Sequence, residues 1–428
     1  MHTENGSRSA RVNRPHRTQV EMQLFSLDQL LSADHRARQV WAFVQGLDLE
    51  PFYGDIQVTD QVAGRTAIAP EILVGLWLLA TLDGIGSARE LARRCETDIP
   101  YLWLLGTVSV NHHTLSDFRV QHGARLEQLL VNTVAALVEV GIVPLETIAQ
   151  DGMRVRASAG KSSFRRRPTL EKLREAAQEH VARLRQEADS EPQAADARRQ
   201  AAAERSARER LQRVEEALRQ HEKLSQQREA RKKGDGESTR VSTTDPDARK
   251  MKMAGGGYDP AFNVQFATDG DARVIVGVDV TNGGTDGGEL PPMLDKVKQQ
   301  YGQRPRQALV DSAYATKESV TAAESAGTKV VSTIPRACEL IAHGKDPHAK
   351  QRGDTQEYAS FRTRMAQPEY QRLYELRPSI AEFPNADCRN RNLKQFRVRG
   401  LVKVKAVALW HALAFNFLRL IDLRVLAI

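Results

Sequence analysis

Apolar residues recur every three or four positions over residues 70–82 and again over 125–141, which is the spacing of amphipathic helices. Between these segments, residues 83–86 (Asp-Gly-Ile-Gly) predict a turn, and Ser87 with Glu90 predicts a capping box that opens the next helix. A further helix start is predicted at Thr114–Asp117. We therefore expect an all-helical domain over residues 20–143, preceded by a basic, disordered tail over residues 1–19.

The pattern changes abruptly at residue 160, where Arg, Glu, Gln and Ala become dominant. Leu170, Leu173 and Ala177 repeat at spacings of three and four, as do Leu211, Val214 and Leu218, and Pro192 separates the two groups. This pattern predicts a helical hairpin or short coiled coil within an insertion over residues 160–250. Such an insertion could clamp DNA, contact a second copy of the chain, or be a solvated, charge-rich projection.

From residue 258 onward, strand-like and helix-like segments alternate. Residues 261–268 and 273–281 predict two strands joined at a turn, so we expect a β-hairpin there. Helices are expected over about 288–300 and 316–326, with strands at 307–311 and 329–334. With a first strand ending at Asp151, this order fits an α/β ribonuclease H-like fold over residues 144–428. In that fold the first and fourth strands are neighbours, so Asp151 and Asp311 would lie close together.

Three carboxylates stand out as candidates for catalysis. Asp151 and Asp311 each follow an apolar, strand-like run, and Glu382 lies on a later segment of helical character, with Glu375 as its main rival. Carboxylate oxygens are the ligands that Mg²⁺ prefers, and two such ions about 4 Å apart can support phosphodiester cleavage. The layout therefore predicts a nucleic-acid phosphoryl-transfer enzyme that uses two Mg²⁺ ions, for which Mn²⁺ can substitute.

Basic residues in the helical region suggest contact with nucleic acid. A helix, a Gly-containing turn and a second helix carrying Arg89, Arg93 and Arg94 could form a helix-turn-helix. The same pattern fits a plain helical hairpin with a solvated basic face.

Overall composition agrees with a nucleic-acid partner. The 428-residue chain carries a formal charge of +8 and has a pI near 9.4, which favours a polyanion. No secretory signal is expected, and the apolar run over 72–82 is too short for a bilayer, so we expect a soluble, intracellular protein without membrane contact. Cys95, Cys338 and Cys388 lack paired spacing, which predicts reduced thiols rather than disulfides or a zinc site.

Several short motifs together resemble bacterial insertion-sequence transposases of the DDE type. They are STTDPDARKMK (242–252), YDPAFNVQFATD (258–269), TNGGTDGGEL (281–290), LVDSAYAT (309–316), a Tyr-x-x-Arg before a Glu, and RVRGLVKVKAVALWHALAFNFLRL (397–420). Residues 60–120 also resemble the helical N-terminal domain of such transposases. The resemblance implies a bacterial, cytoplasmic and nucleoid-associated enzyme that binds the terminal inverted repeats of its element in double-stranded DNA. It also implies strand cleavage, strand transfer to target DNA, and a homo-oligomer on DNA.

By this resemblance, Asp151, Asp311 and Glu382 correspond to the catalytic, metal-binding acids. Tyr374 and Arg377 match the residues that precede the family's Glu, and Arg377 would contact a phosphate. Downstream cations would contact the DNA backbone; those expected to do so are Arg389, Lys394, Arg397 and Arg399.

The chain departs from the family pattern at two places. Arg389 stands where many relatives have Lys, which keeps the charge but changes its geometry. Pro378 and Pro384 flank Glu382, so the helix is expected to begin only at about Pro384, with the Glu on its approach. The irregular surroundings of Glu382 motivate an alternative function, a catalytically inactive, transposase-derived DNA-binding protein. A nuclease relative that hydrolyses without joining is a third option.

The remaining acids and aromatic residues have simpler structural interpretations. Asp245 and Asp247 are expected to be structural or to support the metal ligands, since Asp-Pro forms turns. Asp286 is expected to cap the helix that follows it. Trp410, Phe415 and Phe417 are expected to pack on the sheet.

Overall fold

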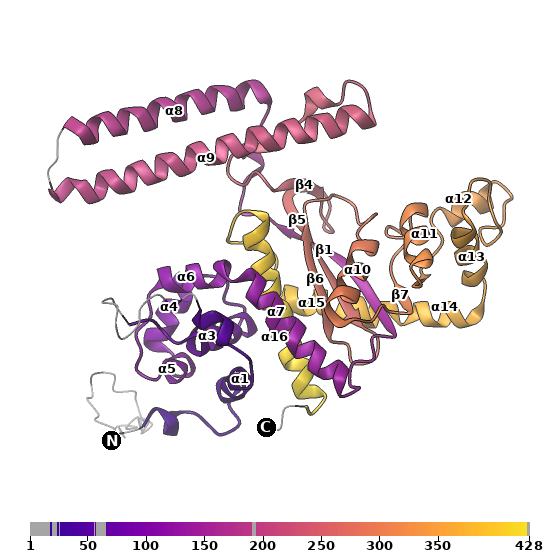
Figure 1. Ribbon diagram of the computed structural model, residues 1–428, viewed down its shortest axis with the longest axis horizontal. Coiled ribbons are helices and arrows are strands. Elements are labelled where there is room, and N and C mark those ends of the chain that lie inside the picture. The colour runs from indigo at the N-terminus through magenta and orange to yellow at the C-terminus, as the bar shows by residue number, and fades with distance from the viewer. Residues whose placement is uncertain are drawn as a thin grey trace, which may run out of the picture.

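The computed structural model describes residue 18, residue 24, residues 26–54, residue 56, and residues 66–190 and 194–425. The expected tail over residues 1–19 and the separating Pro192 lie outside these residues, apart from Thr18. The chain consists of a helical N-terminal region, a mixed sheet covered by helices, a projecting helical hairpin and a small helical lobe at the far edge of the sheet (Figure 1).

The N-terminal region is helical throughout its described part. Helix α3 covers the apolar run predicted at 70–82, and α7 covers most of the run predicted at 125–141, so both helices are confirmed. Ser87 caps α4 as expected, by accepting from the Glu90 N–H at 3.4 Å. The next predicted helix start was wrong by three residues, because Asn111 rather than Thr114 is the cap. The helices are α1 Arg36–Gln45, α2 Glu50–Tyr53, α3 Pro70–Leu82, α4 Ala88–Thr97, α5 Ile99–Leu105, α6 His112–Gln121 and α7 Gly123–Glu139, after a short 3₁₀ turn at Leu27–Leu30.

The central sheet has the strand order β4-β5-β1-β7-β8, with β6 also paired to β5. Strand β5 pairs antiparallel with β1 along one edge and with β6, then β4, along its other edge. Strand β1 pairs with β7 in parallel, which confirms the predicted adjacency of the first and fourth predicted strands. The β5–β6 hairpin is also confirmed. The strands are β1 Thr147–Arg156, β4 Arg249–Lys252, β5 Tyr258–Asp269, β6 Ile275–Thr281, β7 Gln307–Leu309 and β8 Lys329–Val331.

Helices cover both faces of this sheet. Helix α10 (Leu290–Tyr301) packs on one face, where Met293 lies against Gly277 of β6. Helices α15 (Phe383–Asn390) and α16 (Leu401–Asp422) contact β5 and β6, with Phe383 against Phe415. At the far edge, beside β8, lie α11 Lys317–Ser325, α12 Ala337–Ala342, α13 Gln356–Met365 and α14 Pro368–Glu375 (Figure 1).

Helix α16 joins the helical region to the sheet. It contacts α3, α6 and α7 on one side and β6 on the other, so the two regions share one hydrophobic core. Its Trp410 donates to the Arg119 carbonyl at 3.1 Å, and its Asn416 exchanges two hydrogen bonds with the Ile275 backbone. Trp410, Phe415 and Phe417 are buried as expected, although Trp410 and Phe417 contact the helical region, at Phe118 and Phe43, rather than the sheet alone. Among the described helices, only α16 is long and apolar enough to cross a membrane, and its burial here is that of a core helix.

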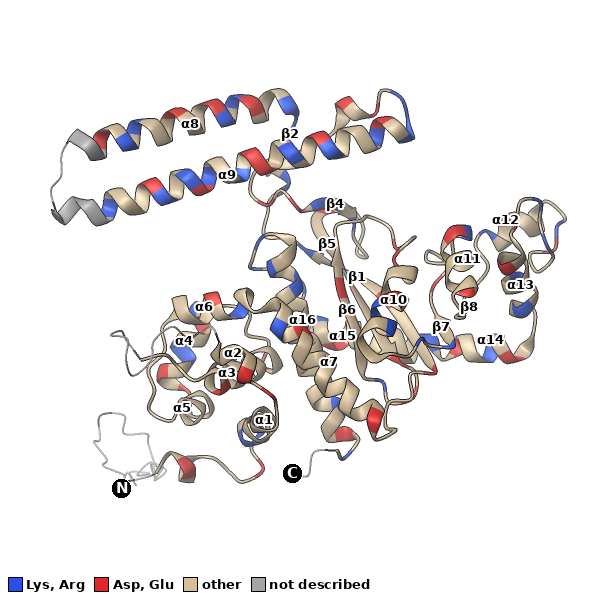
Figure 2. Ribbon diagram, viewed as in Figure 1, with Lys and Arg blue, Asp and Glu red and all other residues tan. Residues whose placement is uncertain are grey.

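A long helical hairpin is inserted between β1 and β4. Helices α8 (Arg167–Ser190) and α9 (Ala194–Arg231) pack side by side and extend away from the sheet (Figure 1). Their base is a two-stranded ribbon of β2 (Phe164–Arg165) and β3 (Val241–Ser242), with short 3₁₀ turns at Lys161–Ser163 and Gly236–Ser238. Charges of both signs alternate along the hairpin (Figure 2), and a small core of Leu170, Ala217 and Val241 closes its base.

Candidate functional site

Asp151 lies in the middle of β1, so the expectation that it ends a strand was wrong. The strand continues through Gly152 to Arg156 because β5 pairs with it along this whole length. In this pairing Asp151 lies opposite Phe266. The carboxylate lies on the face covered by α15, where Asn385 Nδ2 donates to Asp151 Oδ2 at 2.8 Å. Its position is thus fixed by the sheet below and by a helix above.

Arg377 connects Asp151 to Glu382. Its guanidinium donates from Nη2 to Asp151 Oδ1 at 3.0 Å and from Nη1 to Glu382 Oε1 at 3.1 Å. The Arg377 side chain is only 8% exposed, whereas that of Glu382 is 57% exposed. One buried cation therefore holds two of the predicted acids around it, although they lie 231 positions apart in the chain.

Glu382 is the last residue of a π-helical turn, η4 (Pro378–Glu382), which runs directly into α15. The α-helical part begins at Phe383, one residue before the predicted start, but the expectation that Glu382 lies before the helix was wrong, because the π-helical turn makes the helical backbone continuous from Pro378 into α15. Wide turns of this kind accommodate an extra residue in a helix and often occur at functional sites. Here the turn packs against β1 and β5, which brings Glu382 over the sheet near Asp151. The rival acid, Glu375, is exposed at the end of α14.

Asp311 follows β7 by two residues, as the sequence predicted, and the parallel pairing of β7 with β1 places it on the Asp151 side of the sheet. Its Oδ1 accepts from the Ala313 N–H at 2.8 Å, which fixes the turn after the strand. In keeping with this adjacency, the negative charge of Asp311 acts to raise the pKa of Asp151.

The Asp151 carboxyl has an unusual affinity for a proton. Burial is the main cause and raises its pKa to about 6, with Asp311 acting in the same direction. The nearby positive charge of Arg377 and the hydrogen bond from Asn385 act in the opposite direction. A carboxylate whose burial is only partly offset by one arginine is a site at which additional positive charge is favourable.

A second polar cluster lies on the opposite face of β1, and Asp286 is at its centre. Asp286 Oδ1 accepts from Asn263 Nδ2 at 2.6 Å and from Gln265 Nε2 at 3.0 Å, while Oδ2 pairs with Arg154 at 3.2 Å. The expected capping role of its side chain was wrong, because the cap position of α10 is Glu289 and no side chain caps that helix. Gly152 leaves the space that this cluster fills.

Tyr314 connects this cluster to the loop after β7. Its buried hydroxyl donates to Gln265 Oε1 at 2.5 Å, and Gln265 Oε1 also accepts from Gln150 at 2.9 Å. Burial raises the pKa of Tyr314 well above its ordinary value, and the charges of Asp286 and Asp151 add to this effect. The strand that carries Asp151 is therefore supported from its other face by a hydrogen-bonded set of side chains, in which Gln150 Oε1, Arg154 Nε and Asn263 Oδ1 have no partner among the described residues.

Asp245 and Asp247 are structural, as expected. Asp245 Oδ1 accepts from the Gly400 N–H at 3.2 Å, and Asp247 Oδ2 accepts from the Leu401 N–H at 2.9 Å. These two carboxylates thus satisfy backbone donors at the start of α16, where the helix dipole favours negative charge.

The basic residues expected to contact DNA are distributed over the last turn of α15, the segment that follows it, and α4. Arg389 and Lys394 are exposed, while Arg397 is exposed beside α4, and Arg399 donates to the Ser158 carbonyl at 3.2 Å. Tyr374 is half-buried against the core. On α4, Arg93 and Arg94 pair with Glu90 and Asp98, so much of the predicted basic face is neutralised.

Sequence reasoning missed four residues that shape these sites: Asn385, Gln265, Arg154 and Arg119. Each acts through contacts with segments more than 100 positions away or, for Arg119, through burial that no local pattern reveals. Among the described residues, no group of three His, Cys, Asp or Glu side chains is arranged to hold a metal ion. The Arg377 guanidinium lies between two of the three predicted acids instead.

Two family models match the chain. Residues 25–121 match a transposase domain (DUF772), and residues 229–417 match a transposase DDE domain. The second match includes Asp311, Glu382, Arg377 and most of α16, while Asp151 lies before it. No curated protein and no solved structure matches the chain.

Proposed function

Because the chain belongs to the insertion-sequence transposases of the DDE type, we propose that it cleaves DNA strands at the ends of its element and joins them to target DNA. Asp151, Asp311 and Glu382 are the proposed catalytic acids. The helical region over residues 20–143 is the proposed domain for binding the terminal inverted repeats in double-stranded DNA. The proposed protein forms a homo-oligomer on DNA and is associated with the nucleoid in a bacterial cytoplasm.

The single observation that carries this proposal is the convergence of three remote segments on one face and edge of the sheet. Strand β1 brings Asp151, the turn after β7 brings Asp311 beside it, and η4 brings Glu382 to the same Arg377 that holds Asp151. The strand order, with three antiparallel strands followed by two parallel ones, supports a ribonuclease H-like fold for residues 144–428 with an insertion over 160–250.

The three proposed catalytic acids offer the kind of ligand that a hard divalent cation prefers. Three carboxylates supply only oxygen ligands, and the guanidinium of Arg377 shows that positive charge is stabilised between Asp151 and Glu382. Asp151, Asp311 and Glu382 would hold two Mg²⁺ ions, with Mn²⁺ as a substitute, once Arg377 moves aside. Such ions activate the attacking oxygen and stabilise the leaving oxygen in phosphodiester cleavage.

The protein's own residues fix the geometry of this site. Asn385 orients the Asp151 carboxylate, and the turn hydrogen bond to the Ala313 N–H orients Asp311. After its release from the acids, Arg377 would be free to pair with a DNA phosphate, as expected for the Tyr374–Arg377 motif. Exposed Arg389, Lys394, Arg397 and Arg399 would contact the backbone of the bound strand.

The test uses the purified full-length protein with DNA that carries the sequences flanking its reading frame, in Mg²⁺ or Mn²⁺. We expect strand cleavage and joined products from the wild type, and neither from Asp151→Asn or Asp311→Asn, while DNA binding persists. Asp271→Asn, at an exposed turn, is the matched control and should cleave normally. Glu382→Gln should be inactive and Glu375→Gln active; the reverse result would reassign the third acid.

The alternative, a catalytically inactive DNA-binding protein, is favoured by one observation, the Arg377 guanidinium between two acids. Binding of the flanking DNA without any cleavage in either metal would support it. Nicking without joined products would instead indicate a hydrolytic nuclease.

A further inference from the structure

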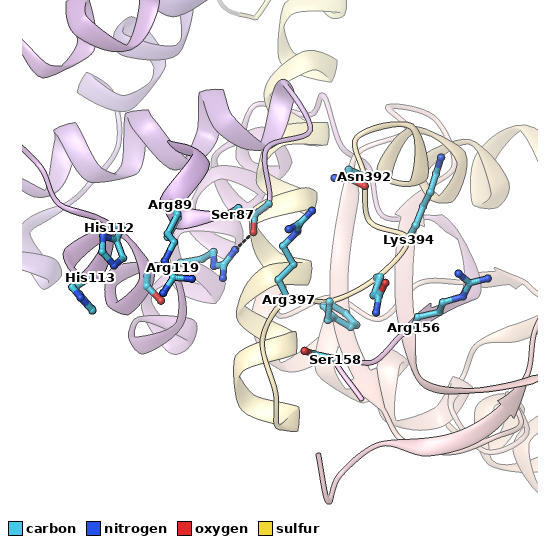
Figure 3. A pocket seen from close by; sticks show the side chains of 15 residues that line it. Ser87, Arg89, His112, His113, Arg119, Arg156, Ser158, Asn392, Lys394 and Arg397 are labelled. Atoms are coloured by element: carbon cyan, nitrogen blue, oxygen red, sulfur yellow. Dashed lines mark hydrogen bonds between the residues drawn. The ribbon is translucent and has the colours of Figure 1, made fainter. Parts of the chain in front are cut away.

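A groove of about 680 Å³ lies between the helical region and the segment that follows α15. One wall is formed by the first residues of α4 and α6, and the other by the end of β1 and residues 392–397 (Figure 3). Five cationic side chains line it. Arg89 and Arg119 come from the helical region, Arg156 from the end of β1, and Lys394 and Arg397 from the segment after α15.

Arg119 is the most informative of these residues because it is buried without a carboxylate partner. The residue is only 7% exposed, yet it forms no ion pair with any described residue, and its Nε has no hydrogen-bond partner there. Its Nη1 donates to the Gly86 carbonyl at 2.5 Å, and its guanidinium lies 4.8 Å from the Trp77 ring centroid. Burying an arginine in this way is costly unless something else neutralises it.

Arg397 adds a second positive charge at the same place. Its Cδ and Nε lie 3.7 Å from the point that a Cβ on Gly86 would occupy, so both arginines converge on Gly86. Burial, together with the positive charge of Arg397, lowers the pKa of Arg119 to about 10. The neighbouring Arg93 and Arg94 differ, because both are neutralised by Glu90.

The backbone of both helices adds to this positive character. Helices α4 and α6 have ten residues each and begin at the groove, with Ser87 and Asn111 as their caps. Helix N-termini carry partial positive charge and free N–H groups, which favour an anion. The N-termini of two helices and two arginines that form no ion pair with any described residue therefore line the same groove.

We propose that this groove binds the backbone of DNA, with Arg119 and Arg397 sharing one phosphate. The bound strand would be held between the N-terminal helical region and the segment after α15. This inference rests on the proposed function for the identity of the polyanion, and it adds the path that the DNA takes. Phosphate oxygens accept bidentate hydrogen bonds from arginine and neutralise the two like charges.

An extended polyanion fits better than a small anion because the groove continues beyond this point. A second hollow, lined by Gly84, Arg89 and the Arg93–Glu90 ion pair, shares Arg397 with the first. A third, on the other side, is lined by Arg397, Arg399 and Lys403, and also by Glu209 and Glu216 of α9. Arg397 thus lies where the three hollows meet. The hollows on the α4 side contain fewer acidic side chains than the hollow beside α9, so their positive charge is offset less.

The test measures binding of a labelled duplex from the DNA flanking the reading frame, and of a scrambled duplex of equal length, over a series of salt concentrations. Arg397→Ala and Arg89→Ala should each weaken binding to both duplexes by roughly tenfold, and should lower the slope of log affinity against log salt by about 0.9. Arg352→Ala, which removes one exposed charge in the loop before α13, is the matched control and should change neither. Unchanged slopes in both groove variants would overturn the proposal.

Two further arms make the result specific. Arg119→Lys keeps the charge, so a variant that melts like the wild type but binds DNA more weakly supports the phosphate contact. If inorganic phosphate raises the melting temperature of the wild type while Arg397→Ala still binds DNA normally, the groove takes small anions only and the DNA path is wrong. Failure here is distinguishable from failure of the proposed function, because a wild type that shows these salt slopes but never cleaves would refute only the catalytic proposal.

Discussion

Replacing Gly152 with alanine tests whether the polar cluster beneath Asp151 is as tightly packed as its geometry shows. A Cβ at this position would lie 2.5 Å from Gln265 Nε2 and 2.8 Å from Asn263 Oδ1, and closer still to Asp286 Oδ1. Real Cβ atoms do not approach polar atoms this closely, so these side chains must move apart. They are buried and joined by hydrogen bonds of 2.6 and 3.0 Å, which leaves little freedom to do so.

The magnitude follows from two contributions. Overpacking a buried site costs about 1–3 kcal/mol. Breaking buried hydrogen bonds to Asp286 costs about 1–3 kcal/mol for each group left unsatisfied. Alanine regains about 0.5–1 kcal/mol over glycine within a strand. We therefore expect Gly152→Ala to lower the free energy of unfolding by about 3 kcal/mol.

The assay is urea denaturation of the wild type, Gly152→Ala, Asp286→Ala and the double variant. Because the new methyl group collides mainly with Asp286, its cost should be smaller by about 1–2 kcal/mol when Asp286 is already alanine. Gly255→Ala is the matched control, since nothing lies within 4 Å of a Cβ there. Equal stability of Gly152→Ala and the wild type, or strictly additive costs in the double variant, would refute the packing argument.

Two further predictions concern buried charges. Arg377→Ala should lower the free energy of unfolding by about 3 kcal/mol because it leaves Asp151 buried without its cation. Adding Asp151→Asn should recover part of this loss. Strictly additive effects of the two substitutions in urea denaturation would count against this pairing. Burial raises the pKa of Asp245 from 3.8 to about 6, so the folded protein holds this proton more tightly than the unfolded chain and loses stability as pH rises through that window. Asp245→Asn should therefore be more stable than the wild type by up to about 3 kcal/mol above pH 6, with the difference vanishing below about pH 4, and a pH-independent difference in denaturation midpoints would contradict the assignment.

The sequence predicted elements and neighbours better than it predicted side-chain partners. Periodic apolar runs located α3 and α7, and the alternation of strands and helices gave the adjacency of β1 and β7. Those features follow from local patterns and from a known strand order. Asp151 was misplaced at a strand end because the Asp-Gly pair resembles a turn. In the structure, pairing with β5 continues the strand beyond this pair.

The candidate site depended on contacts that no local pattern encodes. Arg377 was recognised from its motif, but its position between Asp151 and Glu382 follows from how η4 packs on the sheet. Asp286 resembles a helix cap in sequence, yet its partners lie on β5 and β1. The catalytic acids remain a prediction, because only measured cleavage tests them.

The arrangement of α16 has a consequence for synthesis of the protein on the ribosome. The helix that completes the packing of α3, α6 and α7 is also the last described helix of the chain. The helical region is made before α16, so its apolar face toward this helix stays uncovered until residues near 420 have been made. Products truncated before α16 should expose that face and aggregate, so solubility of the helical region depends on synthesis of a helix almost 300 positions away.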